Sequence, residues 1–489
     1  MNLSSVIKNG FWATYGAIAT RMLSLFSNLM LARLLLPSEF GVIGIAYIFW
    51  AFVNLFVSQD SAGSFLVYKG IEDKRYVNTA FTLGLSIGLV LAFGMVTASP
   101  TIASFFGEPN LVGILIGFAF NLILASIQSI YVGIMTRRML YRELANANLI
   151  ASMVRVFSTA FCASVGLSYW SFVIGDTAFW LTLCVLTQRH VKHKFQLQID
   201  PEIRGEVLSY CLGGTGSSLG FYFNANCDNF IIGKLLGNTY LGFYNFAYQL
   251  TMALNSILNQ AFSQVGMSTF AQLPSDRHQE NALLKVVEQI AFLTAPIYAL
   301  FFLVIDQHTI SLIFGTKWIP SSSVIPWLLI FAYFRLINVA LFFMLSAKGK
   351  PGLNAKINLQ IAPIAILSFI IGACYGEIVG VSIAVALVLG LFWTIYSWWI
   401  GCRAMGWQLR QFLIPCFLPS AIALLAIAFS FSAPGFFKPV VFLVSYGILG
   451  RILAKKQFLT YQVFASIAFL RLMKYTPLSS LLGKGDRGG

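Results

Sequence analysis

The stretch FWATYGAIATRMLSLFSNLMLAR, residues 11–33, is long and apolar enough to cross a membrane, yet it carries Arg21 near its middle. A helix rises about 1.5 Å per residue, so about 20 residues span the hydrocarbon core. Small and polar side chains recur with Arg21 at helical spacing, on one stripe: Thr14, Ala17, Ser24 and Asn28. Because an arginine at the centre of a membrane helix costs about 2.5–3.5 kcal/mol, we expect this stripe to face protein or a cavity instead of lipid.

The composition places the whole chain among membrane proteins. Of its 489 residues, 58% are hydrophobic and 10% are charged, whereas about a quarter of the residues in soluble domains are charged. The net charge of +15 comes from basic residues in loops, so it indicates topology and not nucleic-acid binding. The seven cysteines are scattered through apolar spans, which predicts neither a disulfide framework nor a zinc site.

Hydropathy predicts an all-α polytopic membrane protein with about fourteen transmembrane helices. The predicted spans are residues 11–33, 41–66, 77–99, 110–134, 143–166, 169–188, 206–232, 239–262, 286–306, 322–346, 355–375, 378–401, 411–431 and 437–454. A weaker apolar segment, residues 457–473, is flanked by basic residues and is predicted to lie in the membrane interface. The connections between spans are too short for a soluble catalytic domain.

The lysines and arginines predict the orientation of these spans. With a cytoplasmic N-terminus, the outside loops hold only Arg33, Lys234, Lys317 and Lys438, and most other basic residues lie inside. This positive-inside pattern predicts that both termini are cytoplasmic.

The two halves of the chain repeat. A shift of 201 residues aligns residues 28–59 with residues 229–260. The identical pairs include Asn28/Asn229, Leu34/Leu235, Leu35/Leu236, Gly41/Gly242, Ala46/Ala247, Tyr47/Tyr248, Asn54/Asn255 and Gln59/Gln260. Both repeats begin on the same side of the membrane, so we expect parallel repeats related by an axis along the membrane normal. We therefore predict two pseudo-symmetric six-helix lobes, residues 1–195 and 196–405, followed by two C-terminal helices, residues 406–456, and a cytoplasmic tail, residues 457–489.

Charged residues inside the predicted spans are the first candidates for a site. Arg155 and Asp176 lie on consecutive spans at compatible depth, so they either neutralise each other as a structural pair or belong to a site. Arg21 and Arg335 have no acid at matching depth on a neighbouring span in the sequence, which favours an anionic substrate. Because guanidinium groups pair with phosphate in a bidentate way, we predict that Arg21, Arg335 and Arg155 bind phosphate.

Amide and aromatic side chains supply the second set of candidates. Tyr47 and Asn54 share one face of the second span, and Tyr248 and Asn255 share the equivalent face of the eighth. With Asn28, they predict a cavity wall that binds sugar hydroxyls, although polar residues also join membrane helices by hydrogen bonds.

Two carboxylates are candidates for ion coupling. Asp228 and Asp176 would bind Na⁺ or carry H⁺, and Asp228 is alternatively a carboxylate near the lipid headgroups. Apart from this coupling ion, we expect no cofactor.

Several motifs resemble bacterial polysaccharide exporters of the oligosaccharide-flippase superfamily. They are GFW (residues 10–12), LARLLLP (31–37) with EFG (39–41), and DNFIIGKLLG (228–237) with LGFYNFAY (241–248). The resemblance is closest to the colanic-acid type, in the group that includes O-antigen flippases. It implies an inner-membrane protein that flips undecaprenyl-pyrophosphate-linked oligosaccharide to the periplasmic leaflet, by ion-coupled alternating access, for exopolysaccharide or O-antigen biosynthesis.

The resemblance also implies roles for single residues and partners. Arg21 matches an arginine that lines a cationic cavity between two lobes, and Asp228 matches an acid that holds a cation. The eleventh span offers Asn354, Asn358 and Gln360 but no acid to complete that cation site, a departure from the family pattern. The implied partners are the lipid-linked oligosaccharide, membrane lipids, and polysaccharide polymerase and assembly proteins.

Two other functions compete with this prediction. A multidrug cation antiporter, from a distant arm of the same superfamily, is expected to hold acids in its cavity, whereas this chain has arginines at mid-depth. A membrane-embedded glycosyltransferase or polymerase normally needs acidic catalytic residues or a large loop outside the membrane. The sequence therefore predicts a secondary transporter and not an enzyme.

Overall fold

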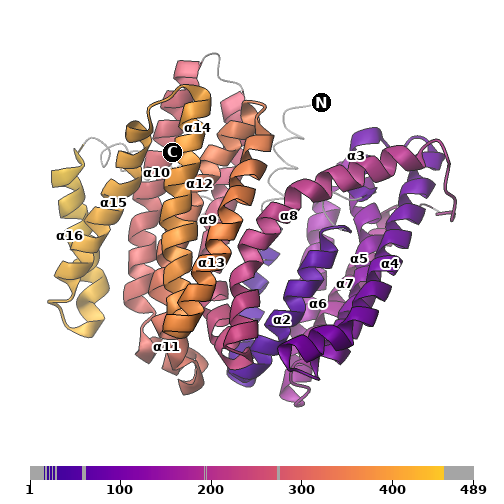
Figure 1. Ribbon diagram of the computed structural model, residues 1–489, viewed down its shortest axis with the longest axis horizontal. Helices are drawn as coiled ribbons and strands as arrows, with labels where there is room; N and C mark the ends of the chain where they lie inside the picture. The colour runs from indigo at the N-terminus through magenta and orange to yellow at the C-terminus, as the bar shows by residue number, and fades with distance from the viewer. Residues whose placement is uncertain are drawn as a thin grey trace, which may run out of the picture. The chain divides into compact units, whose positions relative to one another are not determined.

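The computed structural model describes residues 16, 19–20, 22–24, 26–27, 30–57, 62–191, 193, 195–271 and 276–455. These residues are helical almost throughout and form no strand, which confirms the predicted all-α class (Figure 1). Among them, eight helices are long and apolar enough to cross a membrane, so the chain is a multi-pass membrane protein. The total of about fourteen spans stays a prediction. Arg21, Asn28 and the tail at residues 457–489 lie outside the described residues.

The helices follow one another with short connections. The first half contains α2 (Pro37–Asn54), α3 (Ala62–Lys69), α4 (Lys74–Phe106), α5 (Leu111–Arg137), α6 (Tyr141–Ser164) and α7 (Trp170–Val191). Then come α8 (Arg204–Leu235), α9 (Asn238–Ala271), α10 (Asp276–Val304), α11 (Gln307–Phe314), η1 (Thr316–Ser323) and α12 (Ile325–Ala347). The last are α13 (Pro351–Ala384), η2 (Val385–Phe392), α14 (Trp393–Met405), α15 (Leu409–Ser430), η3 (Gly435–Phe437) and α16 (Lys438–Leu453).

Two span boundaries show what hydropathy can and cannot predict. The break expected between residues 375 and 378 is confirmed, because Gly376 and Glu377 have non-helical backbone angles within α13. The second span, predicted as one helix over residues 41–66, is instead α2 and the separate helix α3. Hydropathy follows depth in the membrane and not backbone continuity, and it therefore missed the turns after Asn54.

Contacts group the chain into two units. Unit 1 comprises Met1–Phe262, Gln307–Ala332 and Lys350–Trp393, and unit 2 comprises Ser263–Asp306, Tyr333–Gly349 and Thr394–Gly489. In unit 1, α5 packs against α2, α3, α4 and α7, and α8 packs against α2, α4 and α13. In unit 2, α10 packs against α15 and α16. The predicted lobe boundaries at residues 195 and 405 stay a prediction.

The repeat reappears as a reciprocal contact in unit 1, where α2 and α9 meet at their first turns. A Cβ atom on Gly41 would lie 1.8 Å from the carbonyl oxygen of Asn238, and one on Gly242 would lie 1.8 Å from that of Pro37. Only glycine allows so close an approach. The 201-residue shift pairs Gly41 with Gly242 and Pro37 with Asn238, so the two contacts are equivalent. An axis between α2 and α9 produces this reciprocity, in agreement with parallel repeats.

Three of the basic residues that the sequence places outside the membrane stabilise helix ends in unit 1. Arg33 donates to the last carbonyl groups of α11, with distances of 2.7 Å from Nε and 2.6 Å from Nη2. Lys234 Nζ donates to the carbonyl of Phe105 at the end of α4, over 2.6 Å. Lys317 Nζ donates to the carbonyls of Arg33 and Leu35, over 2.9 and 2.7 Å. Cations at helix C-termini satisfy free carbonyls and interact favourably with the helix dipole.

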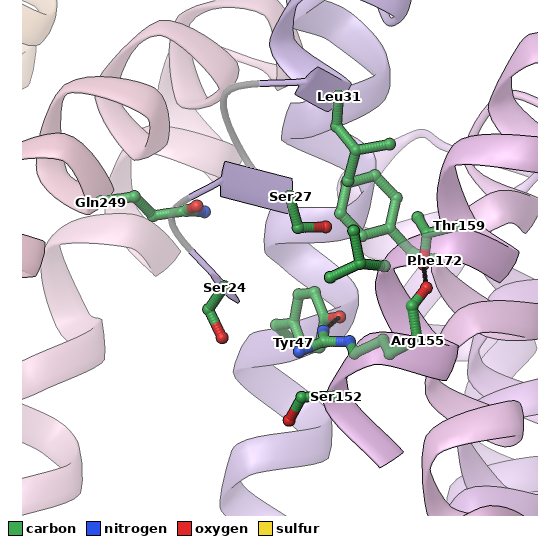
Figure 2. A pocket seen from close by; sticks show the side chains of 10 residues that line it. Ser24, Ser27, Leu31, Tyr47, Ser152, Arg155, Thr159, Phe172 and Gln249 are labelled. Atoms are coloured by element: carbon green, nitrogen blue, oxygen red, sulfur yellow. Dashed lines mark hydrogen bonds between the residues drawn. The ribbon is translucent and has the colours of Figure 1, made fainter. Parts of the chain in front are cut away.

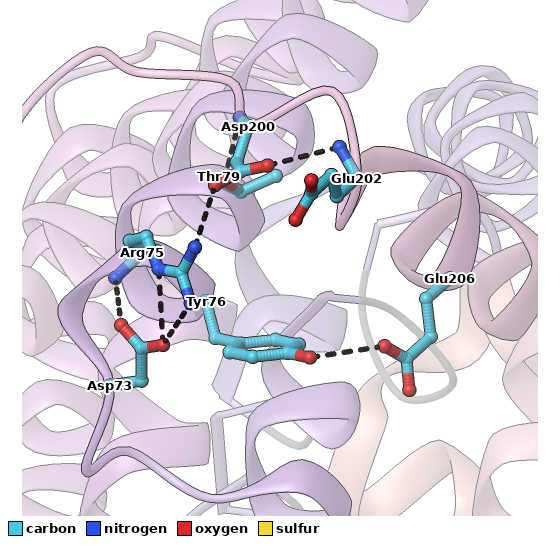
Figure 3. Close-up of polar contacts among 7 residues, drawn as sticks. All are labelled: Asp73, Arg75, Tyr76, Thr79, Asp200, Glu202 and Glu206. Atoms are coloured by element: carbon cyan, nitrogen blue, oxygen red, sulfur yellow. Dashed lines mark hydrogen bonds and ion pairs between the residues drawn. The ribbon is translucent and has the colours of Figure 1, made fainter.

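The connection between α7 and α8 is bonded to the beginning of α4 (Figure 3). The backbone N–H of Asp200 donates to Thr79 Oγ1 over 3.1 Å, and the Asp200 carboxylate lies 3.6 Å from Arg75 Nη1. At the start of α8, Glu206 accepts a hydrogen bond from the hydroxyl of Tyr76 over 3.4 Å. Thr79 thus supplies a partner for a backbone N–H of the non-helical connection, while Arg75 and Tyr76 bind carboxylates at its end and at the start of α8.

Candidate functional site

A polar cavity of about 220 Å³ lies inside unit 1, and we call it the guanidinium cavity (Figure 2). It is lined by three residues of the first helical segment, by α2, α6 and α7, and by one residue of α9: Ser24, Ser27, Leu31, Tyr47, Ser152, Arg155, Val156, Thr159, Phe172 and Gln249. Hydroxyl and amide groups face the cavity together with Arg155, the one charged side chain among the described residues that line it. This combination suits a polar ligand that carries negative charge.

Arg155 belongs to a cluster of three side chains from three helices. Its Nε lies 2.5 Å from Oδ1 of Asp176, and its Nη2 donates to the Tyr47 hydroxyl over 3.0 Å. The Tyr47 hydroxyl in turn donates to Oδ2 of Asp176 over 2.6 Å. The structural pair that the sequence left open is therefore present, with Tyr47 as an unforeseen third member. Charge-assisted bonds of this kind are short and strong, and each group here stabilises the other two.

Packing between helices positions this cluster. Arg155 and Asp176 face each other because α6 and α7 pack together as consecutive helices. The Tyr47 ring on α2 lies against Phe118 of α5, with 5.1 Å between centroids, and against Phe172 of α7, at 6.5 Å. The Asp176 side chain is 12% exposed and that of Arg155 is 36% exposed, so the acid lies behind the guanidinium.

The guanidinium of Arg155 keeps donors for a ligand. An arginine has five N–H groups in a planar fork, and the bonds from Nε and Nη2 use two of them. The other three donate to no residue in the described part of the chain. Because two of them are on Nη1, the group can bind a phosphate oxygen without leaving Asp176.

A second cavity of about 190 Å³ adjoins the first, and we call it the amide cavity. The two share Tyr47, Phe172 and Gln249 in their walls. The remaining lining is aromatic, aliphatic and carboxamide: Phe40, Ile43, Gly44, Ile48, Asn226, Asn229 and Asn245. Unit 1 thus holds two neighbouring polar cavities with common wall residues, one lined by a cation and the other by neutral groups in the described part of the chain.

The other residues predicted to bind sugar have different surroundings. Asn255 is 6% exposed, and its Nδ2 donates to the carbonyl of Ala332 on α12 over 2.8 Å, the kind of helix-joining bond that the sequence kept as an alternative. Tyr248 is half-buried and packs against the rings of Tyr244 and Phe331, with centroids 6.0 and 6.4 Å away. Asn54 is half-buried at the end of α2, and its Oδ1 accepts no hydrogen bond from a described residue.

Asp228 and Arg335 lie outside the walls of both cavities. Asp228 is 2% exposed on α8 and accepts hydrogen bonds from the Tyr244 hydroxyl, over 2.6 Å, and from the backbone N–H of Asn229, over 2.8 Å. The carboxylate is therefore buried within the protein. Arg335 is half-buried on α12 and belongs to unit 2.

Sequence reasoning missed several lining residues. Asn229 is the repeat partner of Asn28, so the repeat itself was a signal that this residue belonged with the predicted sugar ligands. Ser152 and Thr159 flank Arg155 at helical spacing on α6, a pattern that places all three on one face. Gln249 gave no such signal, because the 201-residue shift pairs it with Ile48.

Comparisons with known proteins agree with the predicted resemblance. The sequence model of the family described as polysaccharide biosynthesis protein matches residues 30–323, more than half of the 489-residue chain. The lipopolysaccharide biosynthesis protein WzxC of Escherichia coli strain K12 is 20% identical over 87% of this chain and 87% of its own length. The teichuronic acid biosynthesis protein TuaB of Bacillus subtilis strain 168 is 20% identical over 76% of this chain and 78% of its own.

A solved structure establishes the fold. The lipid II flippase MurJ, in an inward closed conformation, superimposes with a TM-score of 0.74. The match covers 91% of this chain and 99% of that one, at 13% sequence identity. At this identity the likeness concerns the fold alone, and it confirms the all-α transporter-like architecture that the resemblance predicted.

Proposed function

The chain belongs to the polysaccharide biosynthesis protein family, and from this premise we propose that it flips a lipid-linked oligosaccharide across the bacterial inner membrane. The substrate is an oligosaccharide on undecaprenyl pyrophosphate, which moves from the cytoplasmic to the periplasmic leaflet during exopolysaccharide or O-antigen synthesis. Both termini lie in the cytoplasm, as the loop charges predict. The names of the relatives and the fold shared with a lipid II flippase support this proposal.

The observation that carries the proposal is the pair of neighbouring polar cavities inside unit 1, with Arg155 in one wall and carboxamides in the other. A lipid-linked oligosaccharide has a matching order of groups, a dianionic pyrophosphate followed by neutral sugars. The three N–H groups of Arg155 that donate to no described residue suit the phosphate oxygens. The cluster with Asp176 and Tyr47 holds the guanidinium in place and leaves those donors on the cavity side.

Further residues complete the proposal as candidates taken from the sequence. Arg21 and Arg335 are further candidates for positive charge that binds the pyrophosphate. Asn28, Tyr47, Asn54, Tyr248 and Asn255 bind sugar or line its path. We propose secondary transport by alternating access, without enzymatic chemistry, coupled to Na⁺ or H⁺ through Asp228 or Asp176. Polymerase and assembly proteins are the proposed partners that receive the flipped glycan.

A deletion strain tests the proposal directly. We expect the lipid-linked glycan to accumulate on the cytoplasmic leaflet, where an impermeant glycan-labelling reagent added outside spheroplasts does not reach it. Re-expression of this chain alone should restore labelling from outside. Export of an organic cation, with no change in the lipid-linked glycan, would replace flipping by multidrug transport as the function.

The same strain tests the arginine assigned from the first span. Arg21→Ala should abolish surface-glycan export while the protein remains inserted in the membrane, and Arg21→Lys should retain part of it, since lysine keeps the charge but not the fork. Arg189→Ala, at the end of α7 outside both cavities, is the matched control. Normal export in the Arg21→Ala strain removes this residue from the site.

A further inference from the structure

The segment that contains α11 and η1 packs differently from its neighbours in the chain. Gln307–Ala332 belongs to unit 1, although the chain on both sides of it, Ser263–Asp306 and Tyr333–Gly349, belongs to unit 2. Both α11 and η1 have only eight residues, and isolated helices shorter than about 12–15 residues are marginally stable in water. They therefore depend on the part of unit 1 that they contact. We call residues 307–323 the strap.

Hydrogen bonds in both directions join the strap to the end of the first helical segment. Every donor is a side chain, and every acceptor is a backbone carbonyl near the end of a helix. Each helix end thus receives a cation from the other segment, which satisfies carbonyls that lack a partner within their own helix. The bonds run from Arg33 Nε to Ile313 (2.7 Å), from Arg33 Nη2 to Leu312 (2.6 Å), from Lys317 Nζ to Arg33 (2.9 Å) and Leu35 (2.7 Å), and from Trp318 Nε1 to Ala32 (2.6 Å).

Trp318 fixes the strap where the two repeats meet. Its side chain is fully buried, and its ring stacks on Phe246 of α9 with 4.4 Å between centroids. It also contacts Phe40 of α2 edge-on at 5.1 Å. Phe40 is followed directly by Gly41, which makes the close contact with the start of α9. One side chain of the strap therefore bridges both helices, and they do not separate here unless Trp318 loses one of its two partners.

The same contact borders one of the cavities. The amide cavity is lined by residues of both α2 and α9, and Phe40 is one of them. Separation of the two helices at Phe40 would therefore open this cavity on the side of the strap.

We propose that the strap is a clasp that holds α2 and α9 together at their first turns, and that the hydrogen bond from Trp318 to Ala32 sets how often it opens. Release of Trp318 lets the two helices separate there. The strap, the end of the first helical segment and the first turns of α2 and α9 open and close as one cooperative unit. This inference rests on the proposed function, in which alternating access needs an opening towards the outside.

Hydrogen exchange of the purified full chain in nanodiscs tests the clasp. When closing is faster than exchange, the exchange rate of a backbone N–H is proportional to the equilibrium constant of the opening that exposes it. Trp318→Phe keeps a ring between Phe40 and Phe246 and removes the N–H donor. We expect exchange to become about fivefold faster in the strap, the effect of one buried hydrogen bond, and by the same factor in the first turns of α2 and α9.

Trp398→Phe is the matched control, because it removes the same atoms from a fully buried tryptophan. The Trp398 Nε1 donates to no residue in the part of the chain that the structure describes, so no such hydrogen bond is lost. Exchange in the strap, α2 and α9 should stay at the wild-type rate. If Trp318→Phe does not fold, Lys317→Met removes two other bonds of the clasp and should accelerate exchange in the same regions about tenfold.

The outcomes separate a clasp from a docking site that acts alone. Faster exchange in the strap without a change in α2 and α9 would show that the strap detaches by itself, and this overturns the proposal. Unchanged exchange overturns it as well. Equal acceleration in α5 and α7, or in Trp398→Phe, would indicate general destabilisation and no clasp. The measurement uses no glycan, so its failure leaves the proposed function standing, whereas normal glycan export in the deletion strain overturns that function and not the exchange result.

Discussion

Two buried carboxylates in unit 1 have similar bonds and different surroundings. Asp176 accepts a hydrogen bond from Tyr47 over 2.6 Å, and Asp228 accepts one from Tyr244 over the same distance. Asp176, however, also holds Arg155, which lines the guanidinium cavity, whereas Asp228 and its tyrosine lie outside both cavity walls. Burial and a tyrosine partner therefore do not show that a carboxylate lies beside a cavity. The two carboxylates differ in the cation that Asp176 brings to the cavity wall.

The two pairs are not copies made by the repeat. The 201-residue shift places Tyr244 opposite Ile43 and Tyr47 opposite Tyr248, one helical turn further along α9. The repeat therefore does not relate one tyrosine–carboxylate pair to the other. This difference agrees with the two roles that we propose, a counter-ion for Arg155 at Asp176 and ion coupling at Asp228.

The largest effect that separates the pairs should follow from Arg155→Ala. It leaves the Asp176 carboxylate buried without its cation, and removal of one partner from a buried pair costs about 3–5 kcal/mol. We expect the lower end, about 3 kcal/mol, because the Arg155 side chain is 36% exposed and partly screened by solvent. Unfolding of the purified protein by denaturant measures the loss of stability.

The double variant Arg155→Gln/Asp176→Asn is the control for that experiment. It removes both charges together, so its free energy of unfolding should lie within about 1 kcal/mol of that of wild type. It should not bind the pyrophosphate probe, a polyprenyl pyrophosphate whose terminal phosphate carries a methyl ester. A stable Arg155→Ala that binds the probe normally would show that the cluster is neither a counter-ion pair nor part of the site.

The sequence singled out Asp176, Tyr47 and Asp228, but not Tyr244, and it did not indicate which tyrosine contacts which carboxylate. Hydropathy and consecutive spans brought Arg155 and Asp176 to compatible depth, because neighbouring membrane helices usually pack side by side. Tyr47 lies 129 positions before Asp176, and no local pattern shows that α2 turns its ring toward α7. The same holds for Asn255, whose partner is a backbone carbonyl 77 positions away that any residue type would provide.

The helical framework was predictable for a different reason. The apolar runs from α4 to α7 match the predicted spans because lipid demands about 20 apolar residues wherever a helix crosses. The break at Gly376 and Glu377 came from the same rule, since two spans do not fit without a turn. The end of α2 at Asn54 obeys no such demand, so hydropathy extended that helix too far.

Replacing each carboxylate by its amide should have intermediate effects of different kinds. Asp176→Asn frees Arg155 from its counter-ion, so the affinity for the methyl-esterified pyrophosphate probe should rise by about tenfold. That change corresponds to the free energy of about one charge-assisted hydrogen bond. Asp228→Asn should instead weaken the dependence of flipping on a Na⁺ or H⁺ gradient in proteoliposomes. If the gradient dependence is lost in Asp176→Asn and intact in Asp228→Asn, the two roles are reversed.

The smallest effects should come from the tyrosines. Tyr47→Phe and Tyr244→Phe each remove one hydroxyl that donates to a buried carboxylate, so each should cost about 1–2 kcal/mol of unfolding free energy. Tyr47→Phe also removes the acceptor for Arg155 Nη2, which leaves the guanidinium less firmly oriented. We therefore expect Tyr47→Phe, but not Tyr244→Phe, to weaken binding of the methyl-esterified pyrophosphate probe by about threefold. This change corresponds to part of the free energy of one hydrogen bond. Equal losses of probe binding in both variants would mean that Tyr47 and Tyr244 contribute alike to substrate binding. Asp176 and Asp228 would then differ only in their contributions to the stability of the fold.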